Sequence, residues 1–157
     1  ILFKYNIALV MFDGTFRIRS SFFSLDKKNP ENSNFDLSLD LTHSSAGFAL
    51  ATRIMLGESV LHAKKYPQII FSSKKINFVN NRFEILGDLT IKNVTRDLKL
   101  IATPIGFKPT NINNKSELLF NIFGEINRHD FGASAYSGLV GGKILLDSAV
   151  MLSRVKN

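Results

Sequence analysis

The chain has 157 residues, 45% of them hydrophobic and 11% aromatic, so it is long enough for one domain with a sizeable core and too short for two typical domains. It contains no cysteine, which excludes disulfides, thiolate metal sites and cysteine nucleophiles. The net charge of +7 favours anionic partners, but the lysine pairs at 27–28, 64–65 and 74–75 are isolated, so we expect no nucleic-acid partner.

The first two strands are predicted on either side of a tight turn. Apolar and polar residues alternate over residues 1–10, which is typical of a strand with one buried face. Asp13-Gly14 is a favourable hairpin sequence, so we expect the turn at these two residues. The second strand then places Phe16, Ile18 and Phe22 on one face.

Three more strands are expected before residue 92. A loop rich in asparagine and charge, DKKNPENSN at 26–34, leads into the third strand, and Asn80-Asn81 forms the turn between the fourth and the fifth. The third strand has the cleanest alternation of the chain. The apolar residues assigned to the inner faces of these strands are Phe35, Leu37, Leu39, Leu41, Ile70, Ile76, Phe78, Phe83, Ile85, Leu89 and Ile91.

The second half of the chain predicts three further strands. Lys92-Asn93 turns into the sixth strand, the loop KPTNINNKSE at 108–117 precedes the seventh, and the eighth covers residues 140–152. Only GESVLHAKKYP at 57–67 indicates a short helix, near 57–66, which Pro67 ends. The apolar residues of the three strands are Val94, Leu98, Leu100, Leu118, Phe120, Ile122, Ile126, Ile144, Leu146 and Val150.

Eight antiparallel strands would leave two exposed edges in an open sheet, and closure into a barrel removes them. We therefore predict an all-β fold, one domain over residues 1–157 built as an eight-stranded antiparallel barrel. Such a barrel is either filled by side chains or encloses one small ligand. Small residues on the predicted inner face are compatible with both alternatives, because they leave space or interdigitate with large residues. They are Ser20, Gly87, Ala102, Gly124, Gly142 and Ser148.

Four segments follow one another along nearly the whole chain: DGTF at 13–16, AKKYPQIIFSS at 63–73, GDLTIKNVTRDLKL at 87–100, and INRHDFG at 126–132 followed by LVGGKILLDSAVML. In this order they resemble the YceI-like family of polyisoprenoid-binding, lipocalin-like proteins of bacterial envelopes. The resemblance implies an elongated apolar cavity for an isoprenoid or similar amphiphile, export to the periplasm and, in some members, a homodimer. It implies no catalysis and no cofactor.

The alternation, combined with this resemblance, predicts a lipid-binding interior. Strands of about ten residues, tilted by about 40°, give a bore of about 25 Å, long enough for a prenyl chain. The net charge of +7 adds the expectation of transient contact with anionic membrane surfaces. The predicted cavity residues are Phe16, Ile18, Leu37, Leu39, Phe78, Ile85, Leu89, Leu98, Leu100, Phe120, Ile122, Ile144 and Leu146, with Arg128 as a candidate head-group contact at the barrel mouth.

The charged segment FGEINRHDFGASA, 123–135, has three interpretations. In the structural one it forms a corner: Arg128 holds carbonyls with its planar fork, Asp130 caps amides, Phe131 plugs the barrel and Gly132 takes a positive φ. In the second, Arg128 anchors an anionic head group. A catalytic pair of His129 and Asp130 is disfavoured, because adjacent residues of a strand point to opposite faces.

Two other classes of function compete with a lipid carrier. An enzyme acting on an enclosed lipid, such as a cyclase or isomerase, needs an ionisable group inside the barrel, for which the candidates are Tyr5, Arg96 and Lys74. A structural, stress-response barrel needs only a filled core. Three isolated histidines predict no metal site. Because the sequence starts at Ile1 without methionine, we expect either a removed export segment or a domain of a longer chain.

Overall fold

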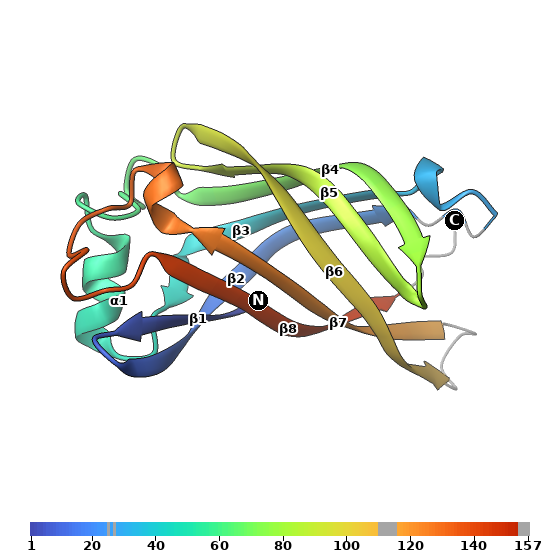
Figure 1. Cartoon of the computed structure of the whole chain (residues 1–157), viewed down its shortest axis with the longest axis horizontal. Helices are drawn as coiled ribbons and strands as arrows, with labels where there is room; N and C mark the ends of the chain where they lie inside the picture. The colour runs from blue at the N-terminus through green and yellow to red at the C-terminus, as the bar shows by residue number, and fades with distance from the viewer. Residues whose placement is uncertain (25, 27, 110–115, 154–157) are drawn as a thin grey trace.

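The computed structural model is a closed barrel in which each strand pairs antiparallel with the next and β8 closes on β1 (Figure 1). It describes all residues except 25, 27, 110–115 and 154–157. The predicted eight-stranded barrel is therefore confirmed, although most of the loop predicted at 108–117 lies outside the described residues. The strands are β1 Leu2–Ile7, β2 Val10–Ser24, β3 Asn34–Ser45, β4 Gln68–Val79, β5 Arg82–Ile91, β6 Val94–Pro109, β7 Ser116–Asn127 and β8 Lys143–Ser153.

The first hairpin turns earlier than predicted. The turn lies at Ala8 and Leu9, where Ala8 has a φ of 52° and Leu9 is 99% exposed. Asp13 and Gly14 belong to β2 instead. Gly14 is required there for a different reason, since a Cβ at this position would collide with the ring of Phe3 on the neighbouring strand.

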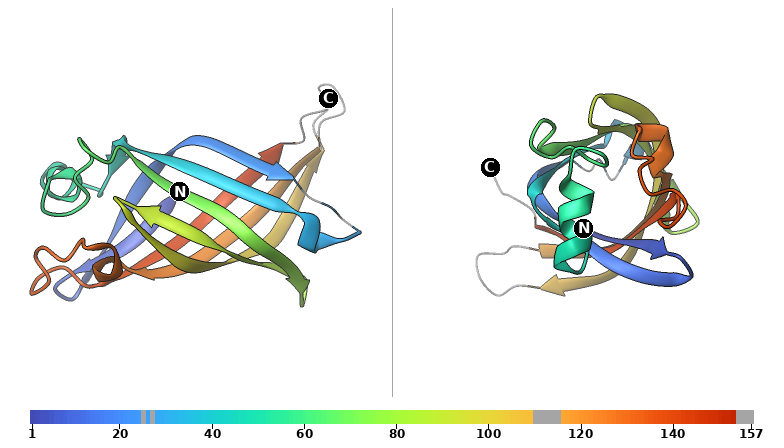
Figure 2. Two further views of the ribbon diagram at one scale, coloured as in Figure 1. Left: turned by 90° about the horizontal axis from the view of Figure 1, so that it is seen from above. Right: turned by 90° about the vertical axis from the view of Figure 1, so that its left-hand side faces the viewer.

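The helix also lies earlier than predicted. Helix α1 spans Ala49–Leu56, and the segment 57–66 consists of turns. Gly57 ends the helix, and its N–H still donates to the carbonyl of Ile54. Seen along the barrel, α1 crosses one end of it (Figure 2). In the part of the chain that is described, no helix combines the length and the apolar character needed to cross a bilayer.

Three strand pairs contain register shifts, which break the simple alternation. One shift lies in β4 between Ser73 and Lys75, where it is paired with β5. Before it, Ile69 and Phe71 are buried, whereas Ile70, which was predicted to face inward, is 44% exposed. Comparable shifts occur between β2 and β3 and between β6 and β7.

A short 3-10 helix, η2 (Arg128–Phe131), follows β7, and another, η1 (Pro30–Asn32), lies in the loop predicted before β3. The turns at Asn80-Asn81 and at Lys92 are confirmed by positive φ angles of 51°, 59° and 59°. Strand β1 is the short member of the barrel. It pairs with β8 at Phe3 and Lys4, and the buried hydroxyl of Ser148 extends the seam by bonding both the N–H and the carbonyl of Leu2, at 2.5 Å and 3.2 Å.

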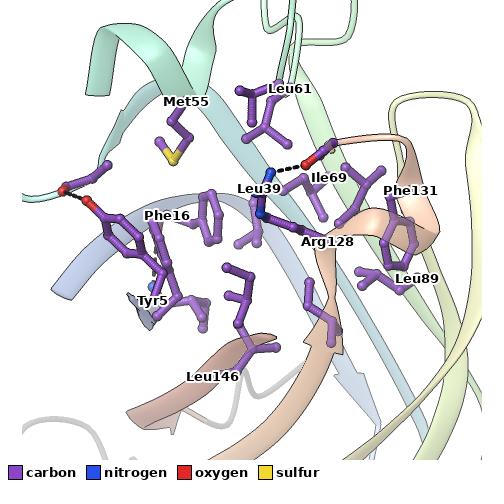
Figure 3. Close-up of a pocket in the computed structure, with 18 of the residues that line it drawn as sticks. Tyr5, Phe16, Leu39, Met55, Leu61, Ile69, Leu89, Arg128, Phe131 and Leu146 are labelled. Atoms are coloured by element: carbon purple, nitrogen blue, oxygen red, sulfur yellow. Dashed lines mark hydrogen bonds between the residues drawn. The ribbon is translucent and has the colours of Figure 1, made fainter. Parts of the chain in front are cut away.

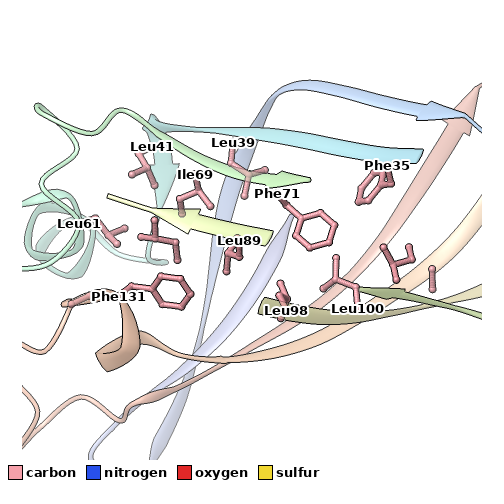
Figure 4. Packing of buried hydrophobic residues seen from close by; sticks show 14 of the residues in the cluster. Phe35, Leu39, Leu41, Leu61, Ile69, Phe71, Leu89, Leu98, Leu100 and Phe131 are labelled. Atoms are coloured by element: carbon pink, nitrogen blue, oxygen red, sulfur yellow. The ribbon is translucent and has the colours of Figure 1, made fainter. Parts of the chain in front are cut away.

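The end of the barrel away from α1 is filled by aromatic side chains. The rings of Phe35 and Phe71 lie 5.9 Å apart, with Leu98 and Leu100 close by (Figure 4). The rings of Phe83 and Phe120 are also 5.9 Å apart. Gly87 makes room for this packing, because a Cβ at this position would lie 2.6 Å from the ring of Phe71. In this part of the interior, small residues therefore interdigitate with large ones, as one of the two alternatives predicted.

Candidate functional site: an apolar cavity behind helix α1

The half of the barrel next to α1 encloses a cavity of about 360 Å³ (Figure 3). Its wall is built from inward side chains of the strands, one face of α1, and the segment after η2. Both alternatives considered for the interior are thus realised, one in each half of the barrel. The predicted cavity residues that line it are Phe16, Leu37, Leu39, Leu89, Leu98, Leu100, Ile122, Arg128, Ile144 and Leu146.

Two of the predicted cavity residues belong to a second, much smaller void. Ile85 and Phe120 are buried, but they line a space of about 20 Å³ in the aromatic half of the barrel. Phe35 and Ile122 line both spaces, so they lie between them. The bore predicted to run the length of the barrel is therefore interrupted at these two residues.

The prediction that Ile18 and Phe78 line the cavity is wrong. Ile18 is 43% exposed and Phe78 is 48% exposed. Ile18 lies beside a register shift and beyond Thr15, the last residue of β2 that pairs with β1. Phe78 is one residue from the end of β4 and packs on Phe83, with the ring centroids 4.7 Å apart. Ile18 thus pairs with β3 but no longer with β1, and Phe78 lies close to the end of its strand.

Sequence periodicity missed the part of the wall that does not come from strands. Helix α1 contributes Ala51, Ile54 and Met55, and the segment after η2 contributes Tyr136 and Val140. The helical part carried a signal, since the residues 49–56, ALATRIML, are mostly strong helix formers. The segment after η2 has no periodicity from which its inward face can be predicted.

The buried hydroxyl groups of Tyr5 and Ser148 in the cavity wall are already hydrogen-bonded within the protein. The hydroxyl of Tyr5 donates to the carbonyl of Ala46 at 2.8 Å, and its burial raises the pKa of the phenol. Ser148 bonds the backbone of Leu2, as described above. A ligand in the cavity therefore meets hydrocarbon almost everywhere, and buried polar atoms on it would lose hydrogen bonds to water without replacement.

Among the described residues that line the cavity, Arg128 is the one with a charged side chain, and its guanidinium holds the segment that follows it. It is only 7% exposed, and this burial lowers its pKa. Nε donates to the carbonyl of Gly141 at 2.9 Å and Nη2 to that of Val140 at 2.8 Å. Nη1 donates to the carbonyls of Ala133 and, at 2.9 Å, Ala135. Four of the five N–H donors of an arginine are thus committed to backbone carbonyls.

The remainder of the segment around Arg128 fits the structural interpretation with one change. Gly132 has a φ of 67° and Phe131 is buried in the cavity wall, both as predicted. The capping role expected of Asp130 falls to Asn127, whose side-chain oxygen accepts from the N–H of His129 at 3.1 Å. Asp130 itself is exposed.

Of the three candidate ionisable groups for an enzyme, only Tyr5 lines the cavity. Lys74 is 54% exposed and pairs with Asp88 at 2.6 Å and Asp97 at 3.0 Å on the outside of the barrel. Arg96 is exposed, and it donates to the carbonyl of the preceding residue at 3.0 Å. Within the described residues there is no group of three histidine or carboxylate side chains arranged to hold a metal ion.

Comparison with known proteins identifies the family. The model of the YceI-like domain matches residues 3–152, nearly the whole barrel. The chain belongs to the YceI-like family. Among curated relatives, Protein YceI of Escherichia coli O157:H7 is 30% identical over 93 residues, which are 59% of this chain and 49% of the relative. The matched part thus spans about half the length of that YceI protein.

Solved structures of similar proteins share the barrel. The YceI protein of Campylobacter jejuni aligns with a TM-score of 0.80 at 24% identity, over 91% of this chain and 85% of that one. BcnA of Burkholderia cenocepacia aligns with a TM-score of 0.81 at 18% identity, over 96% and 94% of the two chains. A polyisoprenoid binding domain from Saccharophagus degradans aligns with a TM-score of 0.62 at 10% identity, over 99% and 92%. At these identities the likeness shows the fold.

Proposed function

We propose that this YceI-like barrel binds an isoprenoid or another elongated lipid, with the hydrocarbon chain inside the cavity behind α1, and that it carries or stores this lipid without covalent chemistry. The observation that carries the proposal is the cavity of about 360 Å³, whose buried polar side chains, those of Tyr5, Arg128 and Ser148, already have partners within the protein. This volume lies within the range of small-molecule sites, toward its lower end. The solved polyisoprenoid binding domain with the same fold supports the choice of ligand class.

Apolar contact alone supplies the affinity in this proposal. Each methylene group that moves from water into the cavity contributes about 0.8 kcal/mol, so a short run of isoprene units suffices for binding in the micromolar range. The one charged side chain among the described lining residues, Arg128, offers no free array of donors to a phosphate or carboxylate, because four of its N–H groups are occupied by carbonyls. We therefore place the polar head of the lipid at the mouth of the cavity, outside the apolar region.

The length of the buried chain is limited by the aromatic half of the barrel. The predicted bore of about 25 Å assumed an open interior. Phe35 and Ile122 instead separate the cavity from the small void beyond it. We propose that only the terminal part of a long prenyl chain, farthest from the head group, is enclosed and that the part next to the head group emerges beside α1.

The cellular setting is proposed from the resemblance to bacterial envelope proteins. We propose a periplasmic location, with which the absence of cysteine is compatible, and transient contact with anionic membrane, which the net charge of +7 favours. Formation of a homodimer also stays a prediction. Fractionation of cells that express the full-length protein tests the location, and recovery in the cytosol would contradict it.

Native mass spectrometry of the protein purified from cells tests the proposed function, because a retained lipid adds its own mass. A titration with geraniol, farnesol and geranylgeraniol then measures how affinity depends on chain length. We expect affinity to rise from geraniol to farnesol by more than tenfold and then to level off, as the enclosed volume is used up.

A cavity-filling variant provides the matched comparison. Ala51 lies in α1 and lines the cavity, so Ala51→Trp places an indole in the space proposed for the lipid. The control is Ala49→Trp, which makes the same exchange at an exposed position of the same helix that does not line the cavity. We expect farnesol binding to be lost in the first variant and kept in the second. Equal binding by both variants would show that the prenyl chain does not occupy this cavity.

A further inference from the structure

The end of the barrel at which the cavity opens carries an exposed apolar rim. Its side chains are between 41% and 99% exposed, and the most exposed of them sits at the tip of the first hairpin, where turns are normally polar. The members of this apolar rim are Leu9, Val10, Met11, Phe48, Leu50, Tyr136 and Leu139.

Three separate segments are joined in the apolar rim: the β1–β2 hairpin, the start of α1, and the segment after η2 (Figure 2). The N–H of Ala8 donates to the carbonyl of Leu139 at 2.8 Å, which fixes the hairpin tip beside the third segment. The ring of Phe12 lies 5.5 Å from that of Phe48, which links the hairpin to α1. The exposed apolar side chains therefore form one surface.

This surface continues into the cavity. Phe48, Leu50, Tyr136 and Leu139 line the cavity and are also exposed, so an apolar path runs from the outside of the rim to the interior. Contiguous exposed apolar surface of this kind is uncommon on soluble proteins and marks an interaction site.

We propose that the apolar rim docks on the surface of a lipid bilayer and presents the cavity mouth to the membrane. The proposal rests on the proposed function, since it supplies the route by which the lipid enters. Exposed cations lie at the same end of the barrel as the rim: Arg53 on α1, and Lys64 with Lys65 in the turn that follows, where Glu58 is the one carboxylate of residues 49–67. An apolar surface that inserts into the interface, bordered by cations that face anionic head groups, is the arrangement that binds such membranes.

The same observations favour a bilayer over a second copy of the chain. Two copies that met rim to rim would bring the like charges of Arg53, Lys64 and Lys65 toward each other. They would also close the mouth of the cavity on both sides. Docked on a bilayer, the mouth receives the hydrocarbon chain of a lipid directly, and the chain need not pass through water.

Sedimentation with vesicles of phosphatidylethanolamine and phosphatidylglycerol tests the proposal. The tip variant is Leu9→Ser with Met11→Ser, because these two side chains are exposed and do not line the cavity. The control is Phe22→Ser with Met151→Ser, two apolar residues that are 59% and 53% exposed near the last residues of β2 and β8, the strand ends that lie away from α1. We expect the tip variant to bind vesicles at least about tenfold more weakly than the wild type and the control to bind like the wild type.

Farnesol binding in solution separates this proposal from the proposed function. The tip variant is expected to bind farnesol like the wild type, because its cavity is intact. Equal vesicle binding by the tip variant and the wild type would overturn the docking proposal alone. So would a dimer that depends on Leu9 and Met11 and shows no vesicle binding, since the rim would then be an interface between copies. A wild-type protein that binds vesicles through the rim but binds no farnesol would instead refute the proposed function.

Discussion

The buried guanidinium of Arg128 makes a quantitative prediction about what holds the mouth of the cavity in place. In Arg128→Met a side chain of similar length keeps the packing but removes the donors to Ala133, Ala135, Val140 and Gly141. A hydrogen bond from a charged group contributes about 1.5–3 kcal/mol. The four bonds hold one segment and do not add up, so we expect the free energy of unfolding to fall by about 4 kcal/mol, a large share of the ~5–15 kcal/mol of a typical domain.

Two further variants make this prediction specific. Arg128→Lys keeps the charge, but its donors radiate from one nitrogen and cannot reach all the carbonyls distributed over residues 133–141. We therefore expect its free energy of unfolding to fall by about half as much as that of Arg128→Met. Arg19→Met removes an exposed arginine of β2 and should change the free energy of unfolding by less than about 0.5 kcal/mol. Urea denaturation followed by circular dichroism measures all three, since the chain has no tryptophan to report by fluorescence.

Hydrogen exchange adds a local measurement to the global one. The amides of residues 133–141 should exchange faster in Arg128→Met than in the wild type under native conditions. A loss of stability below about 1 kcal/mol would refute the assignment of Arg128 to the backbone of this segment. Unchanged stability combined with lost binding of an anionic prenyl lipid would assign it instead to the head group of the ligand.

Two further predictions concern packing and pH. Gly87→Ala should destabilise the barrel by about 1–3 kcal/mol in the same assay, because the new methyl group meets a packed aromatic ring and a backbone carbonyl, whereas Gly138→Ala, with open space around it, should not. Hydrogen bonds from Thr42 and His43 lower the pKa of Asp40 from 3.8 to about 2. This carboxylate therefore stabilises the fold fully above pH 3.8 and loses its contribution as the pH falls toward 2, so the stability difference between wild type and Asp40→Asn should shrink over this range. A difference that stays constant from neutral pH to pH 2 would contradict the role of Asp40.

The barrel and most of its inner face could be predicted from the sequence because alternation survives wherever the register is continuous. In β3, Phe35, Leu39 and Leu41 are buried as their spacing predicts. In β4 the same reasoning chose Ile70, because the register shift between Ser73 and Lys75 changes which residues face inward and has no signature in the sequence. A bulge is a property of a strand pair, and a single strand read alone does not reveal it.

The kinds of residue at the candidate site could be predicted from the sequence, but the segments that surround them could not. The sequence placed a planar cation in a corner next to a glycine, and the structure has both, but the carbonyls that Arg128 holds come from a segment with no periodic pattern. The helix that covers the cavity was missed for a simpler reason. The stop signal of Pro67 directly after residues 57–66 drew the prediction away from the better helix formers at 49–56.

The division of the barrel into a hollow half and a packed half limits how the cavity can discriminate between ligands. A cavity wall without free donors discriminates between hydrocarbon chains only by shape and length, and one methylene group more or less changes binding by about 1–3 kcal/mol at most. Phe35 and Ile122 set the inner limit of that length. In the proposed function, selection between lipids with the same chain arises where the head group lies, at the mouth beside α1, where Arg53, Lys64 and Lys65 face solvent. The two proposals thus assign specificity and entry to the same end of the barrel, and they leave to the depth of the interior only how much hydrocarbon is enclosed.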